Sequence, residues 1–109
     1  MGATKTEGYT AFQVSVASLA KALGHPGRIA ILQELLASEK CQCGQLADQV
    51  GLAQSTVSQH LKELKQAGLI QGKIEGDKPC YCLSPANSGQ LISFLQDLQE
   101  ASEKQIPNC

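Results

Sequence analysis

Hydrophobic residues recur every three or four positions over several stretches of the chain, which is the period of an amphipathic helix. On this pattern we predict helices at about 9–23, 26–38, 45–50, 54–67 and 87–104. Gly24 and Gly68 are placed to end two of them, and Pro26 suits the first turn of another. The apolar positions expected to face inward on the first, second and fourth helices are Phe12, Val16, Leu19, Ala20 and Leu23; Ile29, Ile31, Leu32, Leu35 and Leu36; and Val57, Leu61 and Leu64.

A second pattern, typical of strands, follows the fourth helix. Apolar residues at 69–74 and 81–83 flank the turn sequence 76–78, which predicts a hairpin. Cys41 and Cys43 alternate with polar residues, which predicts a brief strand before the third helix. We therefore expect a mainly α (α+β) fold with about five helices and a two- to three-stranded sheet.

The order of a short helix, a turn at Gly51, a second helix and a hairpin is that of a winged helix-turn-helix. An isolated amphipathic helix with this polar face would be read as simply solvated, but the flanking elements favour DNA binding. Serine, threonine and glutamine can read base edges, and lysine can neutralise phosphates. The predicted DNA contacts are Gln54, Ser55, Thr56, Ser58, Gln59, His60, Lys62 and Lys65 on the helix, with Lys73 and Lys78 on the wing.

Composition limits the function classes. The chain has 109 residues, which fits one domain over 1–109, and so small a domain gains stability from a partner subunit. Its net charge of −1 means that DNA binding must depend on locally arranged cations. No apolar run is long enough to cross a bilayer and residues 1–9 lack a secretion signal, so we expect a cytoplasmic protein with no membrane partner. No catalytic constellation or phosphate loop is present, so we expect no enzyme.

The segments 22–32 (ALGHPGRIAIL), 46–62 (LADQVGLAQSTVSQHLK) and 67–70 (AGLI) resemble the arsenical-repressor (ArsR/SmtB) family over nearly the whole chain. The resemblance implies a homodimer that binds a palindromic operator and releases it when an inducer binds. In that dimer the first and last helices form the interface. Its expected residues are Phe12, Val16, Leu19, Leu91, Phe94, Leu95 and Leu98.

The inducer sites of that family match this chain only in part. The zinc-type site uses Asp, His and Glu on the last helix, where residues 87–104 contain no histidine. The arsenic-type site uses a Cys-x-Cys before the helix-turn-helix, and Cys41-Gln42-Cys43 is similar but lies one residue earlier. Ala53 stands where the family often has a serine helix cap, and alanine there forgoes about 1 kcal/mol.

The five cysteines include a second close pair, Cys80 and Cys82. In a winged helix the short strand usually pairs with the second wing strand, and opposed Cβ atoms then approach within roughly 5.5 Å. Cys41, Cys43, Cys80 and Cys82 would thus form a three- or four-thiolate pocket for As(III), zinc or cadmium. However, Tyr81 and Leu83 look core-facing, which turns Cys80 and Cys82 to the other face; a bulge, another register or Cys109 could reunite the pairs.

We therefore predict a repressor whose operator affinity falls when As(III) or another soft ion binds these thiolates. A redox- or persulfide-sensing repressor is the alternative, and within it a cross-strand disulfide is favoured over one inside a single Cys-x-Cys. A winged-helix protein-interaction module and a small thiol oxidoreductase remain as rivals from other classes. If the cysteines have no sensing role, Cys41 and Cys43 are small buried residues and Cys80 and Cys82 are an incidental exposed pair. His25 is predicted to be a helix-start residue.

Overall fold

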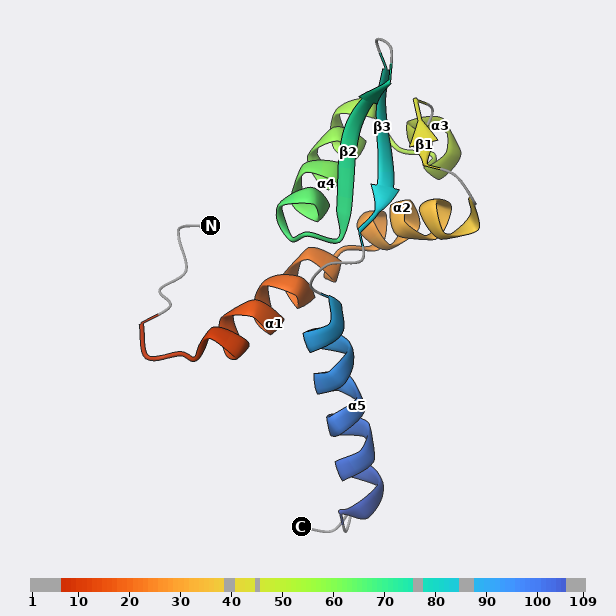
Figure 1. Ribbon diagram of the computed structural model, residues 1–109. Coiled ribbons are helices and arrows are strands. Elements are labelled where there is room, and N and C mark those ends of the chain that lie inside the picture. The colour runs from red at the N-terminus through yellow and green to blue at the C-terminus, as the bar shows by residue number, and fades with distance from the viewer. Residues whose placement is uncertain (1–6, 39–40, 45, 76–77, 85–87, 106–109) are drawn as a thin grey trace.

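A computed structural model shows a helical body with a three-stranded sheet, from which the last helix extends (Figure 1). It describes residues 7–38, 41–44, 46–75, 78–84 and 88–105, and for 42–43, 73–75 and 78 the backbone alone. The element order confirms the predicted fold class. The elements are α1 (Ala11–Leu23), α2 (Pro26–Ala37), β1 (Gln42–Cys43), α3 (Leu46–Val50), α4 (Gln54–Gln66), β2 (Ile70–Glu75), β3 (Lys78–Leu83) and α5 (Ser88–Lys104).

Local capping explains where the helices begin. α1 starts with a capping box in which Thr10 Oγ1 accepts from the Gln13 backbone N–H at 3.1 Å, and Gln13 Oε1 accepts from that of Thr10 at 2.9 Å. The cap of α2 is His25, as predicted, and its Nδ1 accepts from the Gly27 N–H at 2.9 Å. Ala53 caps α4 without a side-chain hydrogen bond, so the first N–H groups of that helix have no side-chain acceptor in their cap.

The main core lies between the helix-turn-helix and the sheet. Leu64 and Ile31 are fully buried there, and half-buried Tyr81 packs against the same cluster from β3. Ile29 and Leu36 were expected in this core, but they are 39% and 69% exposed, because α2 packs against α3 and α4 with one face and leaves the other outward. The buried members of the cluster are Ile31, Leu35, Leu46, Val57, Leu61, Leu64 and Ile70.

The sheet is antiparallel with β3 in the centre, in the order β1-β3-β2. β2 and β3 form the predicted wing, and the turn residues 76 and 77 between them lie outside the described residues. The end of α4 turns into β2 through Gly68, whose φ of 80° is the left-handed conformation that glycine adopts most easily. α4 and the wing are thereby joined by a short, defined turn.

α1 and α5 form a second, smaller cluster in which Val16, Leu19 and Leu91 are buried, with Leu23 and Leu69 packed against them. Beyond Leu91 the side chains of α5 are exposed, and the helix leads away from the body (Figure 1). Two residues from the predicted inward stripe of α1 differ from expectation: Phe12 is 43% exposed and Ala20 is exposed, since α5 covers only part of that stripe.

The core predicts a clear contrast between two leucines. Leu64→Ala removes a fully buried side chain, so we expect the free energy of unfolding to fall by about 2–5 kcal/mol. Leu36→Ala changes an exposed side chain, and we expect a change within about 0.5 kcal/mol. Urea unfolding at one fixed protein concentration measures both, and equal losses would contradict this core.

Candidate nucleic-acid interface and cysteine pairs

The outward face of α4 is polar and accessible. Val57, Leu61 and Leu64 hold the helix against the core, so the residues between them point outward. The predicted contacts that the structure places on this exposed face are Gln54, Ser55, Thr56, Ser58, Gln59, Lys62 and Lys65. The arrangement suits a helix that presents small hydrogen-bonding side chains and two cations to a groove.

Two of the glutamines on this face are held by hydrogen bonds along the helix. Gln54 Nε2 donates to Ser58 Oγ and Gln59 Nε2 donates to Glu63 Oε1, each at 3.3 Å. Both bonds are exposed, so a base edge or phosphate can replace them at little energetic cost. The face therefore combines partial order with free hydrogen-bonding capacity.

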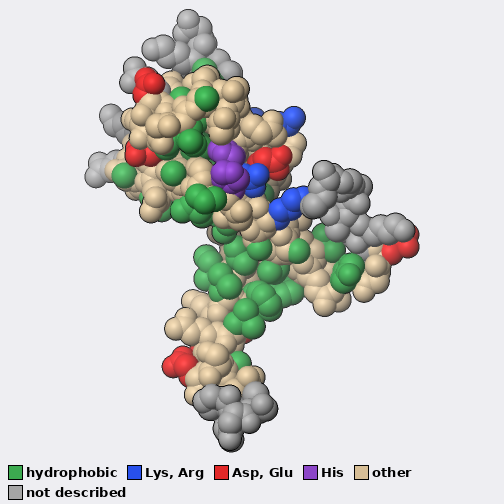
Figure 2. Space-filling view, turned by 180° about the vertical axis from the view of Figure 1, so that it is seen from behind, with side chains coloured by type: hydrophobic (Ala, Val, Ile, Leu, Met, Phe, Trp, Pro, Cys, Tyr) green, Lys and Arg blue, Asp and Glu red, His purple; other side chains and the backbone are tan. Residues whose placement is uncertain are grey.

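His60 does not belong to this face, which corrects the prediction that it contacts DNA. It is only 6% exposed and turns toward α2, where its Nδ1 accepts from Arg28 Nε at 3.4 Å and its ring centroid lies 4.4 Å from that of His25. The histidines accordingly appear as one cluster beside cationic side chains in Figure 2. Its position three residues after Val57 and four before Leu64 places it at the edge of the buried face, a signal that the sequence already contained.

The structure describes only the backbone of the two predicted wing contacts, Lys73 and Lys78. Lys73 lies on β2 opposite Cys80, and Lys78 begins β3 opposite Glu75. Both positions are on the hairpin, in the part expected to run along phosphates. Their contact with DNA stays a prediction.

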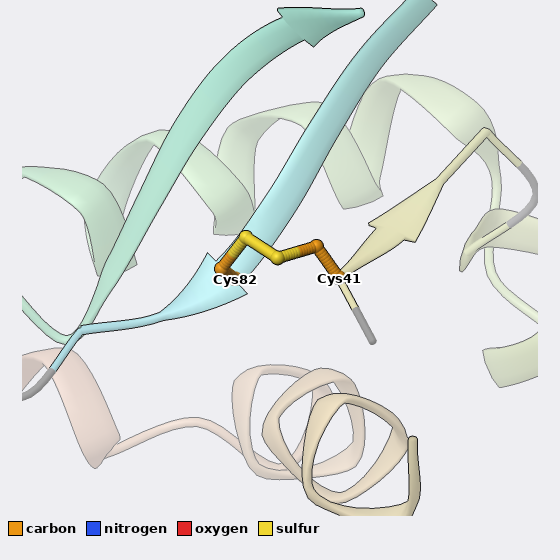
Figure 3. Close-up of a disulfide and its surroundings, with 2 residues drawn as sticks. All are labelled: Cys41 and Cys82. Atoms are coloured by element: carbon orange, nitrogen blue, oxygen red, sulfur yellow. A yellow bond between two sulfur atoms is a disulfide. The ribbon is translucent and has the colours of Figure 1, made fainter. Parts of the chain in front are cut away.

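The strand register brings the two Cys-x-Cys pairs together. Cys43 lies opposite Cys80 in the β1–β3 ladder, and Cys41 and Cys82 are the next residues along on the same side. Cys41 and Cys82 form a disulfide across the strands, with their Cα atoms 4.5 Å apart (Figure 3). Because residues two apart share a face of a strand, the register assigns all four cysteine positions to one face of the ladder without a bulge.

Burial on β3 differs from what simple alternation suggested. Cys80 is fully buried and is itself disulfide-bonded, so it is no incidental exposed cysteine. Tyr81 packs on the core as expected, whereas Leu83 is 39% exposed because it lies at the end of the strand. The central strand is thus covered on both of its faces at Cys80 and Tyr81.

The described residues contain no group of three or more histidine, cysteine or acidic side chains placed to hold a metal ion. The side chain of Cys43 and the whole of Cys109 lie outside the described residues. In the disulfide state the sulfur atoms of Cys41 and Cys82 bind each other rather than an ion. The thiolate pocket therefore stays a prediction about the reduced protein.

The predicted dimer residues divide into two groups. Val16, Leu19 and Leu91 are buried within their own chain, so they offer little surface to a second subunit, and their part in the interface stays a prediction. The other four are between 37% and 53% exposed, and Figure 2 shows hydrophobic side chains gathered where α1 and α5 meet. Among these four, Phe12 and Phe94 stack edge to face with centroids 6.0 Å apart. This exposed apolar set is Phe12, Phe94, Leu95 and Leu98, extended by Tyr9 and Ile92.

Among the described residues, no helix has the length and apolar character needed to cross a membrane.

Comparisons with known proteins agree with this geometry. Residues 25–71 match the model of the family described as bacterial regulatory protein, arsR family. The biofilm growth-associated repressor of Xylella fastidiosa (strain 9a5c) is 34% identical over 90 residues, which cover 83% of this chain and 78% of that one. The crystal structure of the transcriptional repressor BigR from Xylella fastidiosa has a TM-score of 0.61 and 33% identity, and covers 86% of this chain and 92% of that one.

The same fold appears in a homodimeric winged helix-turn-helix DNA-binding domain from Mycobacterium bovis, a possible ArsR-family regulator. It has a TM-score of 0.66 and 23% identity, and covers 99% of this chain and 97% of that chain. The family match, the regulatory relatives and the exposed polar helix agree with one another. The chain belongs to the arsR family of bacterial regulatory proteins, and it is a DNA-binding transcriptional regulator rather than an enzyme.

Proposed function

We propose that this regulator is a homodimeric, cytoplasmic repressor whose operator affinity is set by the chemical state of the cysteines on β1 and β3. The observation that carries the proposal is the register that gives Cys41, Cys43, Cys80 and Cys82 one common face of the ladder. Four cysteines at two rungs of the ladder, separated by the Gln42–Tyr81 pair, form a site that one ion or one oxidation step can change. The remainder of the fold supplies a DNA-reading helix close to that sheet.

DNA binding would use α4 as the recognition helix. Ser55, Ser58 and Gln59 offer donors and acceptors to base edges, while Lys62 and Lys65 supply positive charge to phosphates. With a net charge of −1 the whole molecule has little general attraction for a polyanion. Affinity would therefore depend on the fit of this one face.

The second subunit would cover the exposed apolar set on α1 and α5. Side chains as large as Phe94 and Leu98 at this exposure form a patch of the kind that marks protein interfaces. A two-fold pairing through these helices would present two copies of α4 to successive turns of a palindromic operator. The whole chain, 1–109, would then act as one domain per subunit.

As(III) is the first candidate inducer. In the cytoplasm thiols stay reduced, so the free thiols would be the resting state. Arsenous acid can exchange its three hydroxyl groups for three of these sulfurs, forming three As–S bonds and releasing three water molecules. Zinc or cadmium would use tetrahedral sulfur in the same place.

Oxidation is the second candidate, favoured by the disulfide between Cys41 and Cys82. Two thiols lose two protons and two electrons to an oxidant such as a peroxide and form one S–S bond. The oxidised form would be the released form of the repressor. The two candidates use the same atoms but differ in the reagent that acts on them.

Transmission to DNA would pass through β3. This strand pairs with β1 on one side and with β2 on the other, and Tyr81 packs on the core that holds α4. A bond that fixes the spacing of β1 and β3 would alter how the sheet supports α4. A small change there alters the relative placement of the two recognition helices, and both must fit their half-sites at once.

Lysine substitutions test the proposed DNA face. We expect Lys62→Ala to weaken binding to duplex DNA from upstream of the chain's own coding sequence severalfold and to reduce the salt slope by about one. Lys104→Ala, at the far end of α5, removes the same charge and should change neither quantity. Fluorescence anisotropy at several salt concentrations measures both, and equal effects of the two substitutions would reject α4 as the contact.

Cysteine substitutions test the sensor. As(III), Zn(II) and hydrogen peroxide are each titrated against the preformed DNA complex of the parent, a Cys41→Ser/Cys82→Ser variant and a Cys109→Ser control. We expect the double variant to need at least tenfold more effector for release, while the control behaves like the parent. Peroxide release that is lost in the double variant, together with no response to As(III), would select the redox candidate. A double variant that responds like the parent to every effector would refute the sensor.

A further inference from the structure

Arg28 connects three helices through hydrogen bonds. Its Nη1 donates to the carbonyl oxygens of Lys21 and Ala22, at 3.1 and 3.2 Å, in the last turn of α1. Its Nε donates to His60 Nδ1 at 3.4 Å, in the middle of α4. Arg28 itself lies in the first turn of α2. One side chain therefore fixes α4 relative to α1, the helix that carries part of the exposed apolar set.

The imidazole of His60 is held closely from its other side. A Cβ atom placed on Gly27 would lie 2.8 Å from His60 Nε2, so the ring lies directly over the glycine backbone. The ring of His25 lies 4.4 Å away at an interplanar angle of 52°. His60 Nε2 is buried and has no hydrogen-bond partner among the described residues. Since Nδ1 accepts from Arg28, the single proton of the neutral ring is on Nε2.

We propose that Arg28 and His60 are positioning residues for operator binding, because neutral His60 accepts the hydrogen bond that sets the angle of α4 to α1, and protonated His60 cannot. This inference rests on the proposed operator binding through α4. In a dimer joined through α1 and α5, that angle fixes the separation of the two recognition helices. Operator affinity then falls as the pH drops, independently of the cysteines.

The electrostatic environment agrees with this direction. Burial, then His25, then Arg28 lower the pKa of His60 below 6.5, so the folded form keeps the ring neutral. Arg28 and His25 face the ring from α2 and its cap; α1 contributes the two carbonyl oxygens to Arg28, and on α4 the carboxylate of Glu63 accepts from Gln59. A proton on Nδ1 would point at a guanidinium that can only donate.

The sign of the pH effect on stability follows. In the unfolded chain the ring takes up a proton near pH 6.5, while the folded chain resists it, so the unfolded state binds more protons as the pH falls through that value. The contribution of neutral His60 to stability is complete above pH 6.5 and is lost as the pH drops below it. Operator binding needs the neutral ring of the folded protein, so it should fall at lower pH, as the pH passes through the lowered pKa of folded His60.

His60→Asn separates this positioning role from a purely structural one. The asparagine oxygen replaces the Nδ1 acceptor for Arg28 but does not titrate. We measure anisotropy of a fluorescein-labelled duplex from upstream of the chain's own coding sequence between about pH 4.5 and 7.5, with a reductant and constant ionic strength, because the lowered pKa of the folded ring requires a range that extends well below pH 6.5. We expect the parent to lose affinity about fivefold toward the acid end, a modest allosteric coupling. His60→Asn should match the parent at the neutral end and show no acid loss.

Two further variants complete the test. Arg28→Lys keeps the charge but loses the fork that reaches both helices, so it should bind about fivefold more weakly at neutral pH with a flat profile. His25→Asn removes the other histidine while keeping a helix cap, and it should retain the acid loss. Thermal unfolding over the same pH range provides a readout without DNA, in which only variants that keep His60 should lose stability toward acid.

The outcomes are distinguishable. A parent that fails to bind the duplex at every pH overturns the proposed operator binding, and this inference with it. A parent that binds, but whose pH profile is shared by His60→Asn, overturns the positioning role alone. An acid loss that disappears in His25→Asn and persists in His60→Asn would also overturn it, because the wrong histidine would then be titrating.

Discussion

The antiparallel pairing of β1 with β3 is the constraint on which both the sheet and the cysteine site depend. Because β3 is the central strand, it receives backbone hydrogen bonds from β1 on one side and from β2 on the other. The same pairing sets Cys41 against Cys82 and Cys43 against Cys80. A shift of one residue would send the cysteines of one strand to the opposite face and separate the pairs. The chemistry of the site is thus decided by backbone register rather than by the choice of cysteines alone.

The helices were predictable because their signals are local. Gly24, Pro26 and Gly68 each mark a boundary through caps or backbone conformation that a few neighbouring residues determine. The register of β1 was not predictable in this way, since two residues of strand carry too little pattern to choose between alternative pairings. The sequence therefore left open whether the two cysteine pairs meet, and the strand register shows that they do.

The exposed polar face of α4 was predicted almost completely, because exposed positions follow from the three- and four-residue period of the buried residues Val57, Leu61 and Leu64. The errors lie at the edges of that period. His60 is turned inward by Arg28 and the space over Gly27, contacts between helices that helical period alone does not specify. Ile29 was assigned to the core for its hydrophobicity, although α1, α3, α4 and β3 pack against α2 in a way that leaves Ile29 39% exposed. Which face of an apolar helix is covered depends on partners that composition does not name.

The exposed length of α5 affects the stability of the protein at low concentration. A helix of 17 residues with one buried side chain gains little from its own subunit, and isolated helices of this size are marginal in water. Association would then maintain the helix, so that dilution of the protein would also unfold α5. By mass action, a cell with few copies of the regulator would contain a larger fraction of monomers. In these monomers α5 would be partly unfolded and accessible to proteases. Protein turnover and gene control would in this way share one equilibrium.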